Sequence, residues 1–271
     1  GRVHCVGIAG AGMWTLSRVL HRAGWQVSGS DLSPPERILR AAEELGITIA
    51  AGHAASQVPP VCDLLIYSAA IAETNPERSR ARKLGIPELA YVEVLARIMQ
   101  HRLAVSIAGT HGKSSTTLML AAILQAAGLE PWTLVGAELR REVNPLPERT
   151  EPPSVNSQLL AERSVCLVES CEFREHFLQL APDVICLTSL EADHFDCYPT
   201  LAAAEAAYAR FLQRLRVAPP GLPVQLIYNA RDERVVRLAS TARCRNTAYH
   251  VAPSAGCVVD WLVMGLVWTR V

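Results

Sequence analysis

The chain has 271 residues, which is enough for two ordinary domains that each bury a core of their own. Half of the residues are hydrophobic and 19% are charged, as in a soluble globular protein rather than a disordered one. Lysine plus arginine and aspartate plus glutamate number 26 each. This zero balance gives no electrostatic case for a nucleic acid or an anionic membrane as partner, so any anionic ligand must be held by local groups.

The eight cysteines are scattered without any C-x-x-C pair, and several lie inside apolar runs, as Cys166 does in VCLVE and Cys186 in VICLT. We expect them to be reduced core residues of a cytoplasmic protein, with zinc or disulfides as the minor alternative. Gly1 stands two positions before an apolar strand, which predicts no signal peptide. The apolar run 258–268 is interrupted by Asp260 and is too short to span a bilayer.

In the first hundred residues, short apolar runs alternate with amphipathic stretches. The apolar runs predict strands at 3–8, 27–31 and 64–68. The amphipathic stretches predict helices at 13–23, 34–45, 75–84 and 91–100. The second of these begins with a Pro-Pro pair. Strands separated by helices indicate the α/β class, with a right-handed, doubly wound parallel sheet.

A second α/β unit is predicted after residue 101, so that the domains are 1–101 and 102–271. Its first strand, 103–108, is followed by a glycine turn and a long helix at 115–127. Further strands are predicted at 165–169, 184–188 and 224–228, and a helix at about 200–215. The stretch 142–158 is rich in Pro, Glu, Ser and Asn and is interpreted as a surface loop.

The turn of the second unit has the sequence Gly109-Thr110-His111-Gly112-Lys113-Ser114. A strand, a glycine turn and a helix in this order are typical of a loop that binds a nucleoside triphosphate. Backbone N–H groups and the helix N-terminus would face the phosphates, Lys113 would reach the β- and γ-phosphates, and the Ser114 hydroxyl would face Mg²⁺. The alternative is a chance Gly-Lys turn that begins a helix.

This phosphate loop is shorter than the common form. Only two residues separate Gly109 from Gly112, where the common form has four. The short spacing argues against a generic GTPase or motor ATPase.

The first unit has a glycine turn of its own, Gly7-Ile8-Ala9-Gly10-Ala11-Gly12, between its first strand and helix. Asp31 ends the next strand, where an acid can bind a ribose hydroxyl. The glycines follow G-x-x-G-x-G instead of G-x-G-x-x-G, so the pattern is weak as an NAD fingerprint. The remaining interpretations are a diphosphate at the helix N-terminus or a tight turn without any ligand.

Acids and a histidine follow two strands of the second unit. Glu169 ends the strand 165–169 and Glu172 follows it, while the strand 184–188 leads to Glu191 and the segment ADHFD at 192–196. Carboxylates at the carboxyl ends of parallel strands lie where such sheets bind ligands, and Mg²⁺ prefers oxygen ligands. The alternative for each segment is a solvated loop.

Six segments in chain order together resemble the Mur ligases. They are GIAGAGM (7–13), GSD (29–31), YSAAIAETNPE (67–77), AGTHGKSSTT (108–117), ESCEF (169–173) and EADHFD (191–196). The resemblance implies a Rossmann-like domain for a UDP-sugar, followed by a P-loop-type central ATPase domain and then by a domain that helps to bind an amino acid. It implies that ATP phosphorylates the carboxylate of UDP-N-acetylmuramate, and that the amine of L-alanine attacks the resulting acyl phosphate.

The resemblance also implies roles for residues of both units. The UDP-sugar would be bound in the first unit by Gly7, Gly10, Gly12, Met13, Ser30, Asp31, Ser68 and Asn75. ATP would be bound in the second by Gly109, Thr110, His111, Gly112, Lys113, Ser114, Ser115, Asn229 and Asp232. Mg²⁺ would be held by Ser114, Glu172 and His194. The residues implied in catalysis are Lys113, His111 and His194.

The chain departs from the family pattern in several places. Cys171 and Arg174 stand where acids are typical, and Ser189 stands where Asn is common. The family's third domain has no counterpart in these 271 residues, and there is no initiator Met. We therefore expect a truncated or degenerate copy that binds nucleotide or UDP-sugar but ligates weakly or not at all.

Other functions stay open at this point. A related ligase that recycles a whole peptide onto the same UDP-sugar shares several of these motifs. Folate and cyanophycin-type ligases share the central fold but leave the first hundred residues unexplained. An NAD-dependent dehydrogenase would leave the loop 109–114 unexplained.

Overall fold

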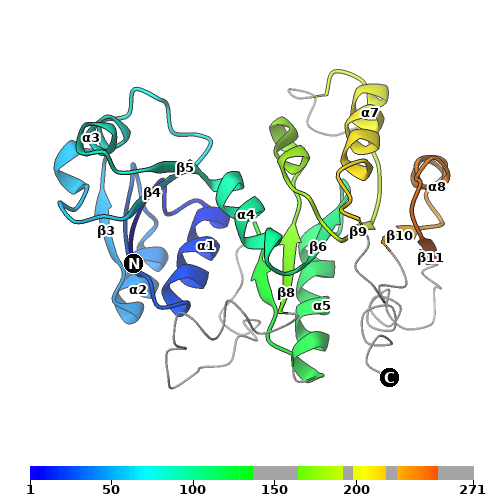
Figure 1. Cartoon of the computed structure of the whole chain (residues 1–271), viewed down its shortest axis with the longest axis horizontal. Coiled ribbons are helices and arrows are strands. Elements are labelled where there is room, and N and C mark those ends of the chain that lie inside the picture. Colours follow the sequence, from blue (N-terminus) through cyan, green and yellow to red (C-terminus); the bar gives the residue numbers. More distant parts are fainter. Residues whose placement is uncertain (128, 137–163, 192–197, 218–224, 250–271) are drawn as a thin grey trace. The chain divides into compact units, whose positions relative to one another are not determined.

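The computed structural model describes residues 1–127, 129–136, 164–191, 198–217 and 225–249 (Figure 1). The predicted loop 142–158, the segment 192–196 with His194, and the apolar run 258–268 lie outside these residues. The described residues form two compact units: the first contains Gly1–Leu95, and the second begins at Ala96. The boundary predicted at 101 stays a prediction.

The first unit is built on a parallel sheet with the strand order β3-β2-β1-β4-β5 among the described residues. The strands are β1 (Arg2–Val6), β2 (Gln26–Asp31), β3 (Thr48–Ala51), β4 (Leu64–Tyr67) and β5 (Glu88–Ala90). The helical segments are α1 (Ala11–Arg22), α2 (Glu36–Leu45), η1 (Ala55–Gln57), α3 (Pro76–Leu84) and α4 (Tyr91–Gln100), of which α4 runs into the second unit. From β1 the strand order runs through β2 to β3 on one side of the sheet, and the later strands β4 and β5 lie on the other side. Open α/β sheets bind ligands at such a reversal of strand order.

Local sequence explains where the helices of this unit begin and end. The Asn75 side chain accepts hydrogen bonds from the backbone N–H groups of Glu77 (2.9 Å) and Arg78 (3.3 Å), and Pro76 occupies the first turn of α3. Gly85 then ends α3 in the left-handed conformation, as Gly46 ends α2.

The second unit is built on a parallel sheet with the order β11-β10-β9-β6-β8-β7 among its described strands. Its strands are β6 (Leu103–Ala108), β7 (Trp132–Leu134), β8 (Val165–Glu169), β9 (Val184–Leu187), β10 (Leu226–Asn229) and β11 (Asn246–Tyr249). Its helical segments are α5 (Lys113–Ala126), η3 (Phe173–Gln179), α7 (Leu201–Leu212) and α8 (Glu233–Ser240).

The core of the second unit lies between this sheet and α5, which packs on β6 and β8 (Figure 1). Leu120 and Leu124 of α5 are fully buried against Val105, Ile107 and Leu167 of the strands. Strands buried on both faces read as continuous apolar runs, which is the pattern of LAVSIA and VCLVE. This packing holds the start of α5 directly beyond the end of β6.

Both predicted parallel sheets are confirmed, with differences at the element ends. The first strand stops at Val6, because residues 7 and 8 already belong to the glycine turn. The helix after the phosphate loop begins at Lys113 instead of residue 115. The sequence interpretation missed four short strands, β3, β5, β7 and β11, and the helix α8.

Three of the cysteines are buried in the core as predicted, whereas the prediction was wrong for Cys171, which is exposed. Cys5, Cys166 and Cys186 have no exposed surface, and burial raises the pKa of each thiol to about 12. They are core residues that stay protonated at neutral pH. Within the described ranges, none of the helices has the length and hydropathy needed to cross a bilayer.

Candidate functional site

The phosphate loop lies between the end of β6 and the start of α5, as predicted. Gly112 begins α5 with φ +80°, and Gly109 has φ +130°. Both values fall in the region that favours glycine. The 14-residue helix α5 therefore points its N-terminus, with its unsatisfied backbone N–H groups, at the turn.

The Lys113 side chain folds back over the loop that it follows. Its Nζ donates to the carbonyl oxygens of Gly109 (2.6 Å) and Thr110 (3.1 Å) and lies 3.1 and 3.3 Å from the two oxygens of Glu172. The side chains of Lys113 and Glu172 are only 11% and 4% exposed. A buried ammonium is thus held beside the loop by groups that a phosphate oxygen could replace.

Carboxylates and a hydroxyl gather at the start of α5. Ser114 Oγ donates to Glu169 Oε1 at 2.8 Å, and Glu172 lies beside Lys113. The register of β6 with β8 explains this, because Ile107 pairs with Glu169 and both strands end at the same edge. The Tyr198 hydroxyl donates to the Glu172 carbonyl oxygen at 2.6 Å and fixes the backbone there.

The segment after β9 supports the loop from the other side. His111 N donates to Ser189 Oγ (2.9 Å), and Thr188 Oγ1 donates to the carbonyl oxygen of His111 (2.6 Å). Glu191 N donates to Thr110 Oγ1 at 2.9 Å. The conformation of the phosphate loop is therefore set by the segment 188–191 as well as by its own glycines.

The structure brings three further predicted residues of this unit close to that segment. Asn229 Nδ2 donates to the Thr188 carbonyl oxygen (3.0 Å), and the Asp232 carboxylate accepts from Leu190 N (2.8 Å) while it caps α8. The His111 ring is 65% exposed, with Nε2 3.5 Å from Glu191. His194, predicted as a catalytic and metal residue, lies outside the described residues.

In the first unit, the glycine turn is fastened to the end of β2. The N–H groups of Gly7 (2.8 Å) and Ile8 (3.0 Å) both donate to the Ser30 carbonyl oxygen. Ala9 N donates to the Asp31 carboxylate at 3.0 Å. Gly10 then stands at the N-terminus of α1. The predicted acid therefore braces the turn.

The other predicted residues of this unit differ in how accessible they are. Met13 is 3% exposed and Ser30 is fully buried, so both stand behind the surface of the turn. Gly12 and Ser68 line it: a Cβ at Gly12 would lie 2.9 Å from the Tyr91 hydroxyl, and Gly7 lies against Ser68. The Asn75 side chain is engaged in capping α3.

Sequence reasoning did not single out Thr188, His53 or Glu77, and it did not predict the contact that Glu169 makes. Glu169 contacts Ser114, and Thr188 contacts the phosphate loop. In the first unit, His53 Nδ1 lies 2.8 Å from Glu77 Oε1 behind the turn. The position of Glu169 at a strand end was visible in the sequence, but its contact depends on strand register.

Comparison with known proteins agrees with this geometry. Residues 2–103 match the family described as "Mur ligase family, catalytic domain", and residues 107–259 match "Mur ligase middle domain". The chain belongs to the Mur ligase family. The two matches correspond to the two glycine turns and the sheets that carry them.

Curated relatives named UDP-N-acetylmuramate–L-alanine ligase are similar over most of this Mur ligase chain. The relative from Rubrobacter xylanophilus is 38% identical over 92% of the chain and 51% of its own length. The one from Acidithiobacillus ferrooxidans is 37% identical over 79% of the chain and 43% of its own length. The chain spans about half the length of the curated relatives it matches.

Solved structures of Mur ligases have the same fold. UDP-N-acetylmuramate:L-alanyl-gamma-D-glutamyl-meso-diaminopimelate ligase from Neisseria meningitides gives a TM-score of 0.73 at 23% identity, over 92% of this chain and 77% of that one. UDP-N-acetylmuramate-alanine ligase from Thermotoga maritima gives 0.66 at 24%, over 92% and 52%.

Proposed function

We propose that this chain forms the UDP-sugar-binding and ATP-binding parts of a ligase of peptidoglycan precursor synthesis. The ligase joins L-alanine to the carboxylate of UDP-N-acetylmuramate through an acyl phosphate. The observation that carries the proposal is the group formed by Lys113, Ser114, Glu169 and Glu172 at the start of α5. The choice of L-alanine is supported by the names of relatives that are 35–38% identical. Because the reaction consumes ATP, the proposal includes a cytoplasmic location.

ATP fits the second unit because the unit offers what a triphosphate needs. Backbone N–H groups at the N-terminus of α5 would face the phosphate oxygens. Lys113 would exchange its contacts with the carbonyl oxygens of Gly109 and Thr110 for contacts with phosphate oxygens. Asn229 and Asp232 hold the neighbouring segment in place, and the adenine would lie on this side.

Mg²⁺ fits the oxygen atoms that gather beside this loop. The Ser114 hydroxyl and the carboxylates of Glu169 and Glu172 are hard ligands, and Mg²⁺ is commonly bound by one or two carboxylates together with phosphates. In the part of the chain that the structure describes, no group of three or more His, Cys, Asp or Glu forms a metal cluster. When bound, the ion would neutralise charge on the phosphates during transfer.

The chain's own residues would contribute positioning and charge neutralisation to the reaction. A carboxylate is a poor electrophile, and its phosphorylation supplies a leaving group for the attack of the amine. Lys113 would balance the charge of the transferred phosphoryl group, and the exposed His111 would lie near the reacting carboxylate. The glycine turn of the first unit, with Asp31 behind it, would bind the diphosphate of the UDP-sugar.

Calorimetric titration with UDP-N-acetylmuramate and then with Mg·ATP tests both halves of the proposal. The chain has only two lysines, so Lys83→Ala on α3 is a matched control for Lys113→Ala. We expect Lys113→Ala to lower the ATP affinity at least tenfold, the order of a lost charged hydrogen bond of about 2 kcal/mol. Its affinity for the UDP-sugar and both affinities of Lys83→Ala should be unchanged. A folded chain that binds neither ligand would overturn the proposal.

A further inference from the structure

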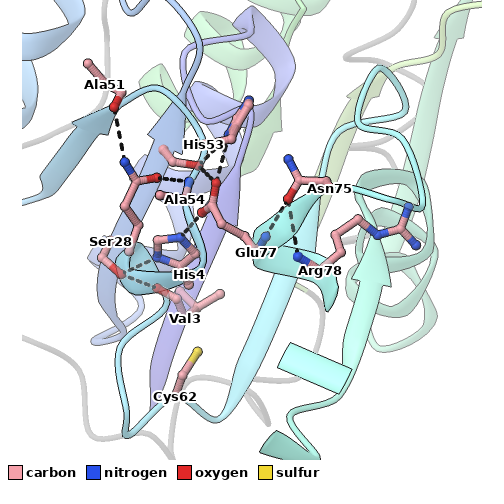
Figure 2. A network of polar contacts seen from close by, with 12 residues as sticks. Val3, His4, Ser28, Ala51, His53, Ala54, Cys62, Asn75, Glu77 and Arg78 are labelled. Carbon is pink, nitrogen blue, oxygen red and sulfur yellow. Dashed lines mark hydrogen bonds and ion pairs between the residues drawn. The ribbon is translucent and has the colours of Figure 1, made fainter. Parts of the chain in front are cut away.

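The first unit contains a polar network around one buried carboxylate, that of Glu77 (Figure 2). Glu77 Oε2 lies 2.7 Å from His4 Nε2 on β1. Its other oxygen, Oε1, accepts from Ser30 Oγ on β2 (2.8 Å) and lies 2.8 Å from Nδ1 of His53, which follows β3. A single side chain from α3 therefore joins three neighbouring parts of the sheet.

The positions of the protons follow from this geometry. Burial alone would raise the pKa of the Glu77 carboxyl, but hydrogen bonds from His4, Ser30 and His53 outweigh burial and hold the pKa below its ordinary value. An ionised carboxylate only accepts hydrogen bonds, so each ring nitrogen that faces it must carry a proton. This places N–H at Nε2 of His4 and at Nδ1 of His53.

The other nitrogen of the His53 ring then becomes an acceptor. Nε2 is on the side of the ring away from Glu77 (Figure 2), and in a neutral ring with its proton on Nδ1 it keeps a lone pair. The side chain is 16% exposed. Gly52 N donates to the Asp31 carbonyl oxygen at 2.8 Å, which fastens this segment beside the end of β2.

The same network reaches the glycine turn through Ser30. The Ser30 hydroxyl is bonded to Glu77, while its carbonyl oxygen accepts from Gly7 and Ile8. In sheets of this kind the diphosphate lies at the first turn, and the acid at the end of the second strand faces the ribose. His53 lies beyond that strand, next to β3, and therefore on the nucleoside side.

We propose that Glu77 is a positioning residue, which holds His53 as its Nδ1–H tautomer so that His53 Nε2 accepts a hydrogen bond from an O–H or N–H group of the ligand's nucleoside. The inference rests on the proposed function, because it assumes that this unit binds a UDP-sugar. His4, whose Nδ1 is 2.9 Å from Ser28 Oγ, holds the carboxylate from the opposite side.

The tautomer can be measured directly by NMR of the whole chain labelled with ¹⁵N and ¹³C in its eight histidines. The His53 signals are identified by their loss in His53→Asn. We expect the Nδ1–H tautomer in the unaltered chain and a shift toward Nε2–H in Glu77→Gln, whose amide no longer demands a proton from the ring. An Nε2–H tautomer of His53 in the unaltered chain would overturn the proposal.

Titration with UDP-N-acetylmuramate tests the acceptor. In His53→Asn the amide N–H can still face Glu77, but no acceptor remains at the position of Nε2. We expect roughly three- to tenfold weaker binding for both His53→Asn and Glu77→Gln, the size of one hydrogen bond. Glu88→Gln is the matched control, because Glu88 pairs with Arg78 and Arg82 outside the network and its loss should leave binding unchanged.

Two failures can be told apart. If the unaltered chain does not bind the UDP-sugar, the proposed function is wrong, and so is the proposed contact of His53 with the nucleoside. If the unaltered chain binds the UDP-sugar and His53→Asn binds it equally well, only the proposed contact of His53 with the nucleoside is wrong. Titration with Mg·ATP, which uses the second unit, shows that each variant remains folded there, and hydrogen exchange of β1 and β2 does the same for the first unit.

Discussion

At Gly109 the phosphate loop passes within contact of the segment after β9. A Cβ built there would lie 2.2 Å from Thr188 Oγ1 and 2.8 Å from the backbone nitrogen of Ser189, and φ is +130°. Gly112 also has a positive φ, +80°, but a Cβ there would meet nothing within 4 Å. The two glycines of one loop are therefore required for different reasons, the first by space and conformation and the second by conformation alone.

This difference predicts unequal effects of alanine at the two positions. Gly109→Ala should cost about 3 kcal/mol or more, because overpacking adds to backbone strain. Gly112→Ala should cost about 1 kcal/mol, from strain only. Urea unfolding of the second unit, followed by hydrogen exchange at β6 and β9, measures both. Equal losses in the free energy of unfolding would mean that the segment at Thr188 moves to accommodate the added Cβ at little cost.

The Glu77 carboxylate predicts a pH dependence of stability in the first unit. Its folded-state pKa is lowered, so its contribution is fully present above the ordinary carboxyl pKa and is lost as the pH falls through the lower folded-state value. The difference in free energy of unfolding between the unaltered chain and Glu77→Gln should therefore shrink as the pH falls below about 4.5. Hydrogen exchange at β1 in urea, between pH 6 and pH 3, checks this. A difference that stays constant would contradict it.

Among the strands, the sequence predicted those inside the two sheets and missed those at the edges. LAVSIA and VCLVE form β6 and β8 inside the second sheet, with a paired strand on each side. β3 (TIAA) and β11 (NTAY) are edge strands with exposed positions, and they lack a run that local pattern can recognise. These edge strands form because they pair with strands that are distant in the sequence.

The same limit applies to the candidate sites. The loop 109–114 was predictable because its glycines, lysine and flanking elements are contiguous. The contact of Glu169 with Ser114 joins residues 55 positions apart, and that of His53 with Glu77 joins residues 24 apart. These contacts follow from strand register and from the packing of α3, neither of which a linear pattern contains.

For the whole molecule, two compact units with separate sheets imply two separately stabilised parts. A ligand stabilises only the part that binds it, by about 2.7 kcal/mol at a hundredfold excess over Kd. We expect UDP-N-acetylmuramate to slow hydrogen exchange in β1, β2 and α1, and Mg·ATP to slow it in β6 and α5. Protection of both units by either ligand alone would show that their stabilities are coupled.

The burial of Lys113 has a chemical consequence. Amine-reactive reagents attack the neutral, accessible form of an amine, and the Lys113 ammonium is held by two carbonyl oxygens and a carboxylate. The only other lysine, Lys83, is exposed on α3. Mild acylation followed by peptide mass spectrometry should therefore modify Lys83 first and leave Lys113 untouched. A label placed at Lys83 in this way would report on the first unit while leaving the phosphate loop chemically intact.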